Sequence, residues 1–152
     1  MSDTCMNHLE RYWKTLTLSS NENFVKKNYR EALDGYTEAL YRAEVLNNHW
    51  EQCVRLKIPV IQVYIISCNN LANTHEELNE LPKAQAFLKR AIYFLIHLLE
   101  TTTTTSDCIQ GDLKKALLTY ADFLQRTHYT TKDDPTFHAL VDAIVKNEPK
   151  KL

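Results

Sequence analysis

The chain has 152 residues, of which 44% are hydrophobic and 24% charged, and its formal net charge is −1. This is an ordinary composition for one soluble globular domain. Two glycines are too few for the many tight turns of a β-sandwich, so we expect an all-α fold of long helices. Lysine and arginine are spread along the chain, and the absence of a basic patch disfavours nucleic acid or a membrane surface as a partner.

The first residues and the cysteines predict a cytoplasmic protein. The opening "MSDTCMNHLERYW" lacks the charged stretch followed by an apolar stretch that marks a secretory signal. The longest apolar run, Ile58 to Cys68, is shorter than the ~20 residues that a membrane-spanning helix needs. Four widely separated cysteines without a C-x-x-C pair indicate reduced thiols; they are Cys5, Cys53, Cys68 and Cys108.

Apolar spacing predicts about six helices, and the first two occupy the N-terminal third. The first covers about 7–27, with a weak point near Ser19, because "TLTLSSNEN" is poor helix-forming sequence. The second begins near Tyr29 and continues to a break at Lys57, because the residues before Pro59 are pushed out of the helical region.

The third and fourth predicted helices form the middle of the chain. The third opens at Pro59, a favoured first-turn residue, and runs to about Leu78. Its first half is apolar nearly all round, so we expect it to be central. The fourth opens at Pro82. Its apolar face consists of Ala84, Phe87, Leu88, Ala91, Ile92, Leu95 and Leu99.

The last third predicts a loop and two more helices. The run "TTTTTS" (101–106) is β-branched and suits a surface loop. The fifth helix begins near Asp107 and carries Leu113, Ala116, Leu117, Tyr120, Ala121 and Leu124 on one face. Asp134 is expected to cap the sixth helix, with Pro135 at its first position. The sixth helix is expected to bury Phe137, Leu140, Val141, Ile144 and Val145.

The third and fourth helices resemble a tetratricopeptide repeat, whose pattern is W-x2-L-G-x2-Y, then A-x3-F, then P. The residues at those places fit the pattern by size rather than by identity. They are Cys68, Leu71, Ala72 and His75, followed by Ala84, Leu88 and Ile96. The small residues Ala72 and Ala84 predict a close crossing of the two helices.

The first pair resembles the same repeat in its second half, through Tyr29, Ala32, Tyr36 and Ala39. The spacing departs from the family, because Ala32 and Ala84 are 52 residues apart and the usual repeat is ~34 residues. We therefore expect the second helix of each pair to run on for extra turns. The third pair is degenerate, as a capping repeat should be.

The whole chain resembles short uncharacterised bacterial tetratricopeptide-like proteins. The resemblance implies one domain over 1–152, in which antiparallel hairpins (about 7–56, 58–100 and 107–147) stack as a short right-handed solenoid. It also implies a concave surface, formed by the first helices, that binds a peptide or another protein, and it supplies no catalytic residue and no cofactor.

Three functions follow as hypotheses. The first is a non-enzymatic scaffold or adaptor that binds a protein segment on the concave face. The alternative is a secretion-type chaperone of the same repeat class. The third, from another class, is a helical metal-dependent enzyme built on His75, Glu76 and Glu77.

One polar stripe on the third helix is the candidate partner-binding site. Its members are amides and carboxylates: Asn69, Asn70, Asn73, Glu76, Glu77 and Glu80. Amides along a groove could hydrogen-bond the backbone of an extended peptide, because an amide both donates and accepts. The stripe fits a solvated polar face equally well. Lys14 and Asn21 on the first helix could face the same groove, but they are too few for a carboxylate clamp.

A possible pair of metal ligands and a set of large aromatic residues are two further features of the sequence. His49 and Cys53 lie four residues apart, but a structural zinc site needs four ligands, so no metal site is expected. Large aromatic residues could anchor an interface, and a homodimer surface near Trp50 is one hypothesis. The other aromatic candidates are Tyr12, Trp13, Tyr41 and Tyr64.

Overall fold

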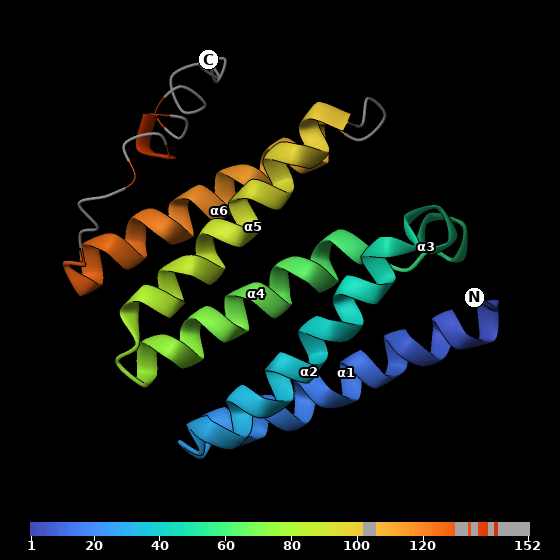
Figure 1. Ribbon diagram of the computed structural model, residues 1–152, viewed down its shortest axis with the longest axis horizontal. Helices are drawn as coiled ribbons and strands as arrows, with labels where there is room; N and C mark the ends of the chain where they lie inside the picture. The colour runs from blue at the N-terminus through green and yellow to red at the C-terminus, as the bar shows by residue number, and fades with distance from the viewer. Residues whose placement is uncertain (102–105, 130–133, 135–136, 140–141, 143–152) are drawn as a thin grey trace.

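The computed structural model describes residues 1–101, 106–129, 134, 137–139 and 142. Within them the chain is helical and has no strand, so the predicted all-α class is confirmed. The helices are α1 (Asp3–Val25), α2 (Tyr29–Asn48), α3 (Trp50–Leu56), α4 (Val60–Glu77), α5 (Leu81–Thr101) and α6 (Ser106–Thr127), as Figure 1 shows. Residues 137–139 are also helical, while Leu140, Val141, Ile144 and Val145 of the predicted sixth helix lie outside the described residues.

The first helix is continuous, so the weak point predicted near Ser19 was wrong. Packing compensates for the poor helix propensity there. Ser20 is buried against Gly35 of α2, and a Cβ atom placed on Gly35 would lie 2.0 Å from the Ser20 Oγ. Glycine therefore allows α1 and α2 to approach closely at this point.

The predicted second helix is interrupted, and this is a second correction. It ends at Asn48, and His49 (φ −117°, ψ 47°) leaves the helical conformation before the short α3 begins. Asparagine is a weak helix former, and the "NNH" run places two of them at the break. The Arg55 guanidinium of α3 donates to both Asp3 carboxylate oxygens at 2.6 and 2.9 Å, which fixes α3 against the start of α1.

The central position predicted for the third helix is confirmed, because α4 packs against both α2 and α5. Ala72 and Ala84, the predicted crossing residues, are both buried in one hydrophobic cluster. The second helices also run past the expected repeat end, α2 to Asn48 and α5 to Thr101.

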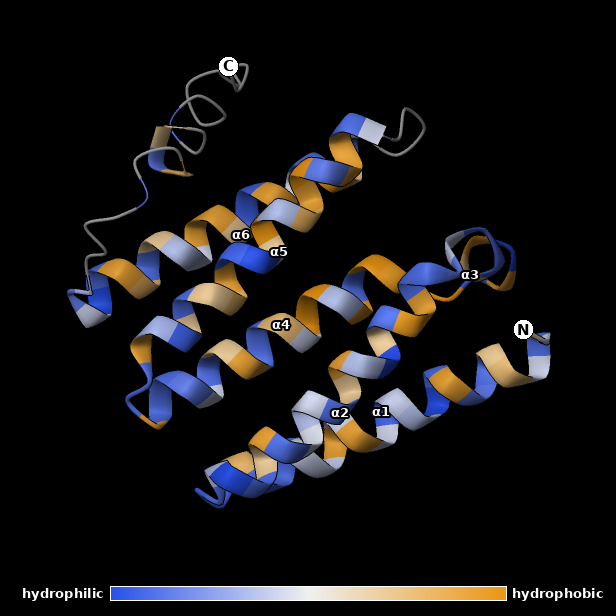
Figure 2. Cartoon of the chain, viewed as in Figure 1, coloured by the Kyte–Doolittle hydropathy of each residue, from blue (hydrophilic) through white to orange (hydrophobic). Residues whose placement is uncertain are grey.

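Two hydrophobic clusters hold the helices together. One lies among α1, α2, α3 and α4 and includes Ala91 of α5, and the other lies among α4, α5, α6 and Phe137. Trp50 and Ile61 contact both clusters. Figure 2 shows the result as apolar stripes on helices whose other faces are hydrophilic. No helix among the described residues is long and apolar enough to cross a membrane.

The helices α1, α4 and α6 run in the same direction (Figure 1). Gln62 near the start of α4 donates to Asp112 near the start of α6 at 3.0 Å. Glu76 near the end of α4 accepts from Arg126 near the end of α6. In both of these hydrogen-bonded contacts, the two residues are 50 positions apart in the sequence, so α4 and α6 run parallel. On the other side of α4, the Trp13 indole of α1 donates to the Ser67 hydroxyl at 2.8 Å.

Candidate functional site

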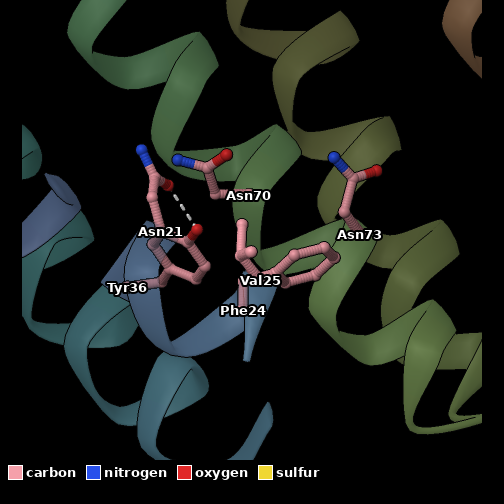
Figure 3. A pocket seen from close by; sticks show the side chains of 6 residues that line it. All are labelled: Asn21, Phe24, Val25, Tyr36, Asn70 and Asn73. Atoms are coloured by element: carbon pink, nitrogen blue, oxygen red, sulfur yellow. Dashed lines mark hydrogen bonds between the residues drawn. The ribbon is translucent and has the colours of Figure 1, made fainter. Parts of the chain in front are cut away.

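A hollow of about 190 Å³ opens between α1, α2 and α4 (Figure 3). We call it the amide hollow. Its lining combines three amides, one phenol and two apolar side chains: Asn21, Asn70, Asn73, Tyr36, Phe24 and Val25. Phe24 and Val25 come from the last turn of α1, and Asn70 and Asn73 are one turn apart on α4. The site therefore depends on the packing of helices that are distant in sequence.

Hydrogen bonding divides the three amides into one that is held and two that are available. The Tyr36 hydroxyl donates to Asn21 Oδ1, as the dashed line in Figure 3 shows. Burial raises the pKa of Tyr36, so this donor keeps its proton at neutral pH. Within the described residues, the Asn70 and Asn73 side chains make no hydrogen bond to protein. Each can donate and accept, which is what the backbone of an extended peptide requires.

Exposed apolar side chains lie on the same helix faces as residues that line the amide hollow. Val25 is 80% exposed and Leu18, seven residues earlier on α1, is 64% exposed. Ile66 lies seven residues before Asn73 on α4 and is 39% exposed. Residues seven apart on a helix share a face, so polar and apolar side chains occupy the same helix faces.

The structure separates the six residues predicted as one binding stripe. Asn70 and Asn73 line the amide hollow. Asn69 lies seven residues from both Gln62 and Glu76, and those two contact α6. Since heptad neighbours share a helix face, Asn69 lies on the side of α4 that meets α6.

The carboxylates of the stripe contact other parts of the fold. Glu76 accepts two hydrogen bonds from the Arg126 guanidinium at 2.7 and 3.0 Å. Glu77 lies beside Tyr29, and burial together with the Glu77 charge raises the pKa of that phenol. These contacts tie α4 to α6 and to α2.

Glu80 lies at the turn between α4 and α5. Its carboxylate is 3.2 Å from His75 Nδ1, 3.5 Å from Lys83 Nζ and 3.9 Å from Arg30 of α2. The His75 hydrogen bond is the main cause that lowers the pKa of Glu80, followed by the charges of Lys83 and Arg30. Two of the three carboxylates of the predicted stripe, Glu76 and Glu80, are thus paired with basic neighbours.

Four of the residues lining the hollow were not among the predicted site residues: Asn21, Phe24, Val25 and Tyr36. Asn21 was expected to face inward, and it does. Phe24, Val25 and Tyr36 were missed because nothing in the sequence shows that the end of α1 meets the middle of α4. Lys14, the other expected inward residue, is instead within 3.9 Å of Glu10 on its own helix.

The three residues of the metal-enzyme hypothesis point to different neighbours. His75 is buried and stacks on Phe87 at 5.6 Å, while Glu76 and Glu77 meet Arg126 and Tyr29. They therefore do not converge on one point. The described part of the chain contains no group of three or more histidine, cysteine, aspartate or glutamate side chains placed to hold a metal ion.

Cys53 and Cys68 are buried in the protein core. The Cys53 thiol is buried and donates to the Leu46 carbonyl at 3.2 Å, which places it in the core beside the break at His49. Cys68 is also buried, and burial raises the pKa of its thiol to about 12. A thiol with that pKa is not a nucleophile at neutral pH.

The aromatic residues proposed as interface anchors divide by exposure. Trp13 and Tyr64 are buried in the core, and Trp50 is half-buried between the two clusters. Tyr12 and Tyr41 are exposed, and the Arg42 guanidinium lies 4.9 Å from the centre of the Tyr12 ring.

A second depression lies along the first half of α1. Its volume is about 400 Å³, and Thr4, Asn7, Glu10 and Arg11 line it. All four residues come from one helix, so this is an open helix surface without an opposing wall. The amide hollow is the better candidate because three helices enclose it.

Comparison with known proteins gives a family without a described activity. A family described as "Protein of unknown function (DUF2753)" matches residues 11–144. No curated protein and no solved structure matches the chain.

Proposed function

The chain belongs to the DUF2753 family, and from its geometry we propose that it is a non-enzymatic scaffold that binds an extended peptide segment at the amide hollow. The observation that carries the proposal is the pair Asn70 and Asn73. Both line a hollow, and within the described residues neither side chain has a hydrogen-bond partner. Asparagine is a poor choice for a helix interior on propensity grounds, and a peptide ligand would explain two of them one turn apart.

The arrangement of the helices supports a tetratricopeptide-like mode of binding. The first helices α1, α4 and α6 run parallel, with contacts at offsets of 54 and 50 residues. In a repeat solenoid such helices form the inner wall, where ligands bind. The amide hollow lies on this wall, between the first and second units.

The side chains around the hollow indicate the chemistry of the ligand. The amides would pair with peptide N–H and C=O groups, and this pairing is independent of the ligand's sequence. Leu18, Val25 and Ile66 would contact apolar side chains of the same segment. Since Glu76 and Glu80 are already paired with basic residues, a strongly basic ligand is not required.

A selection experiment tests the proposal. A display library of random nine-residue peptides is selected on the wild-type chain, and the binders are measured by fluorescence anisotropy. We expect Asn70→Ala/Asn73→Ala to weaken these binders by about 30-fold, since two lost hydrogen bonds at roughly 1 kcal/mol each give about 2 kcal/mol. The matched control is Asn48→Ala/Gln125→Ala, which removes two exposed amides outside the hollow and should change affinity less than twofold.

Two results would contradict the proposal. One is a set of binders that both double variants retain equally, with circular dichroism showing unchanged helix content. The other is the absence of any enriched peptide on the wild-type chain. The selected sequences also define the chemistry of the ligand. Enrichment of apolar side chains is expected for both the scaffold and the secretion-type chaperone, because Val25 lines the hollow.

A further inference from the structure

The residues after α6 place one phenylalanine in an aromatic socket on α5 and α6. We define the aromatic socket as Lys89 and Tyr93 of α5 together with Tyr120 of α6. Phe137 is 0% exposed, and its ring centre lies 5.3 Å from each of the two tyrosine rings, in edge-to-face geometry. The Lys89 ammonium lies 4.7 Å from the ring centre. A cation and two aromatic edges therefore surround one side chain.

A carboxylate three residues earlier completes the contact. Asp134 Oδ2 accepts from Lys89 Nζ at 2.7 Å, and Asp134 Oδ1 accepts from the Phe137 backbone N–H at 3.0 Å. The second bond is the capping bond expected for Asp134 at a helix start. It is followed by the first helical bond, from the His138 N–H to the Asp134 carbonyl at 3.1 Å. One carboxylate thus docks the segment and also fixes the turn that presents Phe137.

The side chains that form the socket come from α5 and α6 and not from the segment that fills it. Lys89, Tyr93 and Tyr120 all belong to the antiparallel pair of α5 and α6, and Gln85 donates to the Tyr120 hydroxyl at 3.0 Å. With Asp134 and Phe137 in place, only 15% of the Lys89 side chain is exposed, and its ammonium is paired with the Asp134 carboxylate. A lysine enclosed by its ligand needs a carboxylate partner, so the socket favours an acidic ligand. A peptide with the same two side chains could make the same contacts without being part of this chain.

We propose that the aromatic socket is a recognition site for a partner peptide that carries an acidic residue three positions before a phenylalanine, at the start of a helical turn. Asp134 and Phe137 occupy the site in cis, and a partner with this motif displaces them. Proline after the acidic residue, as in this chain at Pro135, would pre-organise the ligand, because proline suits the first helical position. This site is separate from the amide hollow.

The test uses the full chain and a fluorescein-labelled peptide with the sequence of residues 132–142. Phe137→Ala empties the socket, and this variant should bind the peptide saturably. A peptide with alanine in place of the phenylalanine should bind it at least tenfold more weakly. The wild-type chain should also bind the intact peptide at least tenfold more weakly, because its own segment competes at a high effective concentration.

A second variant covers the case in which Phe137→Ala alters the fold. Asp134→Lys keeps the phenylalanine but repels Lys89, so it should also accept the peptide. A charge exchange adds a specificity check. Lys89→Glu together with Phe137→Ala should prefer a peptide whose acidic residue is replaced by lysine.

Three results would overturn the proposal. The peptide could fail to bind variants whose helix content is unchanged. It could bind the wild type and Phe137→Ala equally, which would indicate attachment elsewhere. Both single variants could unfold, which would make the segment an inseparable part of the core.

Discussion

The two sides of α4 contact their neighbouring parallel helices, α6 and α1, in different ways. Toward α6, polar and charged side chains meet directly: Gln62 with Asp112, and Glu76 with Arg126. Toward α1, contact is made through the buried Trp13–Ser67 hydrogen bond, and beyond it the helices leave the amide hollow. The comparison suggests that parallel helices can contact one another at both ends or at one level, with a hollow left at another.

The largest effect is expected from removing the contact that holds α1 against α4. Trp13→Ala should lower the free energy of unfolding by about 3–5 kcal/mol, as for other buried aromatic residues replaced by alanine. The loss includes the hydrogen bond to Ser67. Guanidinium unfolding followed by circular dichroism measures the change. Tyr41→Ala, which removes a 57% exposed aromatic side chain from α2, is the control and should cost less than about 1 kcal/mol. Equal losses in the two variants would show that Trp13 does not hold this interface.

A smaller effect is expected on the α6 side. The Glu76–Arg126 pair is partly exposed, and pairs of this kind contribute roughly 0.2–1 kcal/mol. A double-mutant cycle with Glu76→Gln and Arg126→Gln should give a coupling energy in that range, and it should fall as salt is raised. Peptide binding at the amide hollow should be unchanged in both variants. A coupling of zero at low salt would mean that the pair does not stabilise this side.

The smallest effect concerns the turn that follows α4, where Glu80 meets His75 of α4 and Arg30 of α2. The pKa of Glu80 is lowered in the folded chain below its ordinary value of 4.5. The carboxylate therefore stabilises the fold above that pH, and the contribution is lost as the pH falls through the lowered folded pKa. Wild type should melt at a higher temperature than Glu80→Gln at pH 7, and the difference should shrink below pH 4.5. A difference that is constant with pH would contradict this assignment.

Local patterns in the sequence predicted the helices well, because apolar spacing and proline positions act within one helix. The small residues Ala72 and Ala84 are both buried in the same core, and the Asp134 cap is present. Two predictions failed where tertiary packing or a short polar run decided the outcome. Gly35 packing on Ser20 sustains α1 through a poor helix-forming stretch, and His49 divides the second helix.

The candidate site was predicted only in part, and the reason is physical. Helical periodicity shows which residues of α4 share a face, but not which neighbour that face meets. Asn70 and Asn73 therefore could not be separated from Glu76, which contacts α6. Tyr36 was noted only for the repeat pattern and Val25 not at all, because their place in the hollow arises only when α1, α2 and α4 come together.

The 50-residue offset between the parallel helices α4 and α6 has a consequence for the length of the helices. A usual tetratricopeptide unit has ~34 residues, so the α4–α6 offset is about 16 residues longer, or about eight for each of two helices. At 1.5 Å per residue this adds about 12 Å along the helix axis. Trp13 joins Ser67 at one height, and Asn21 and Asn73 face the hollow about two turns further on. Under the proposed function, these helices are long enough to hold the Trp13–Ser67 contact and the peptide site at separate levels, so binding a peptide would leave that contact in place.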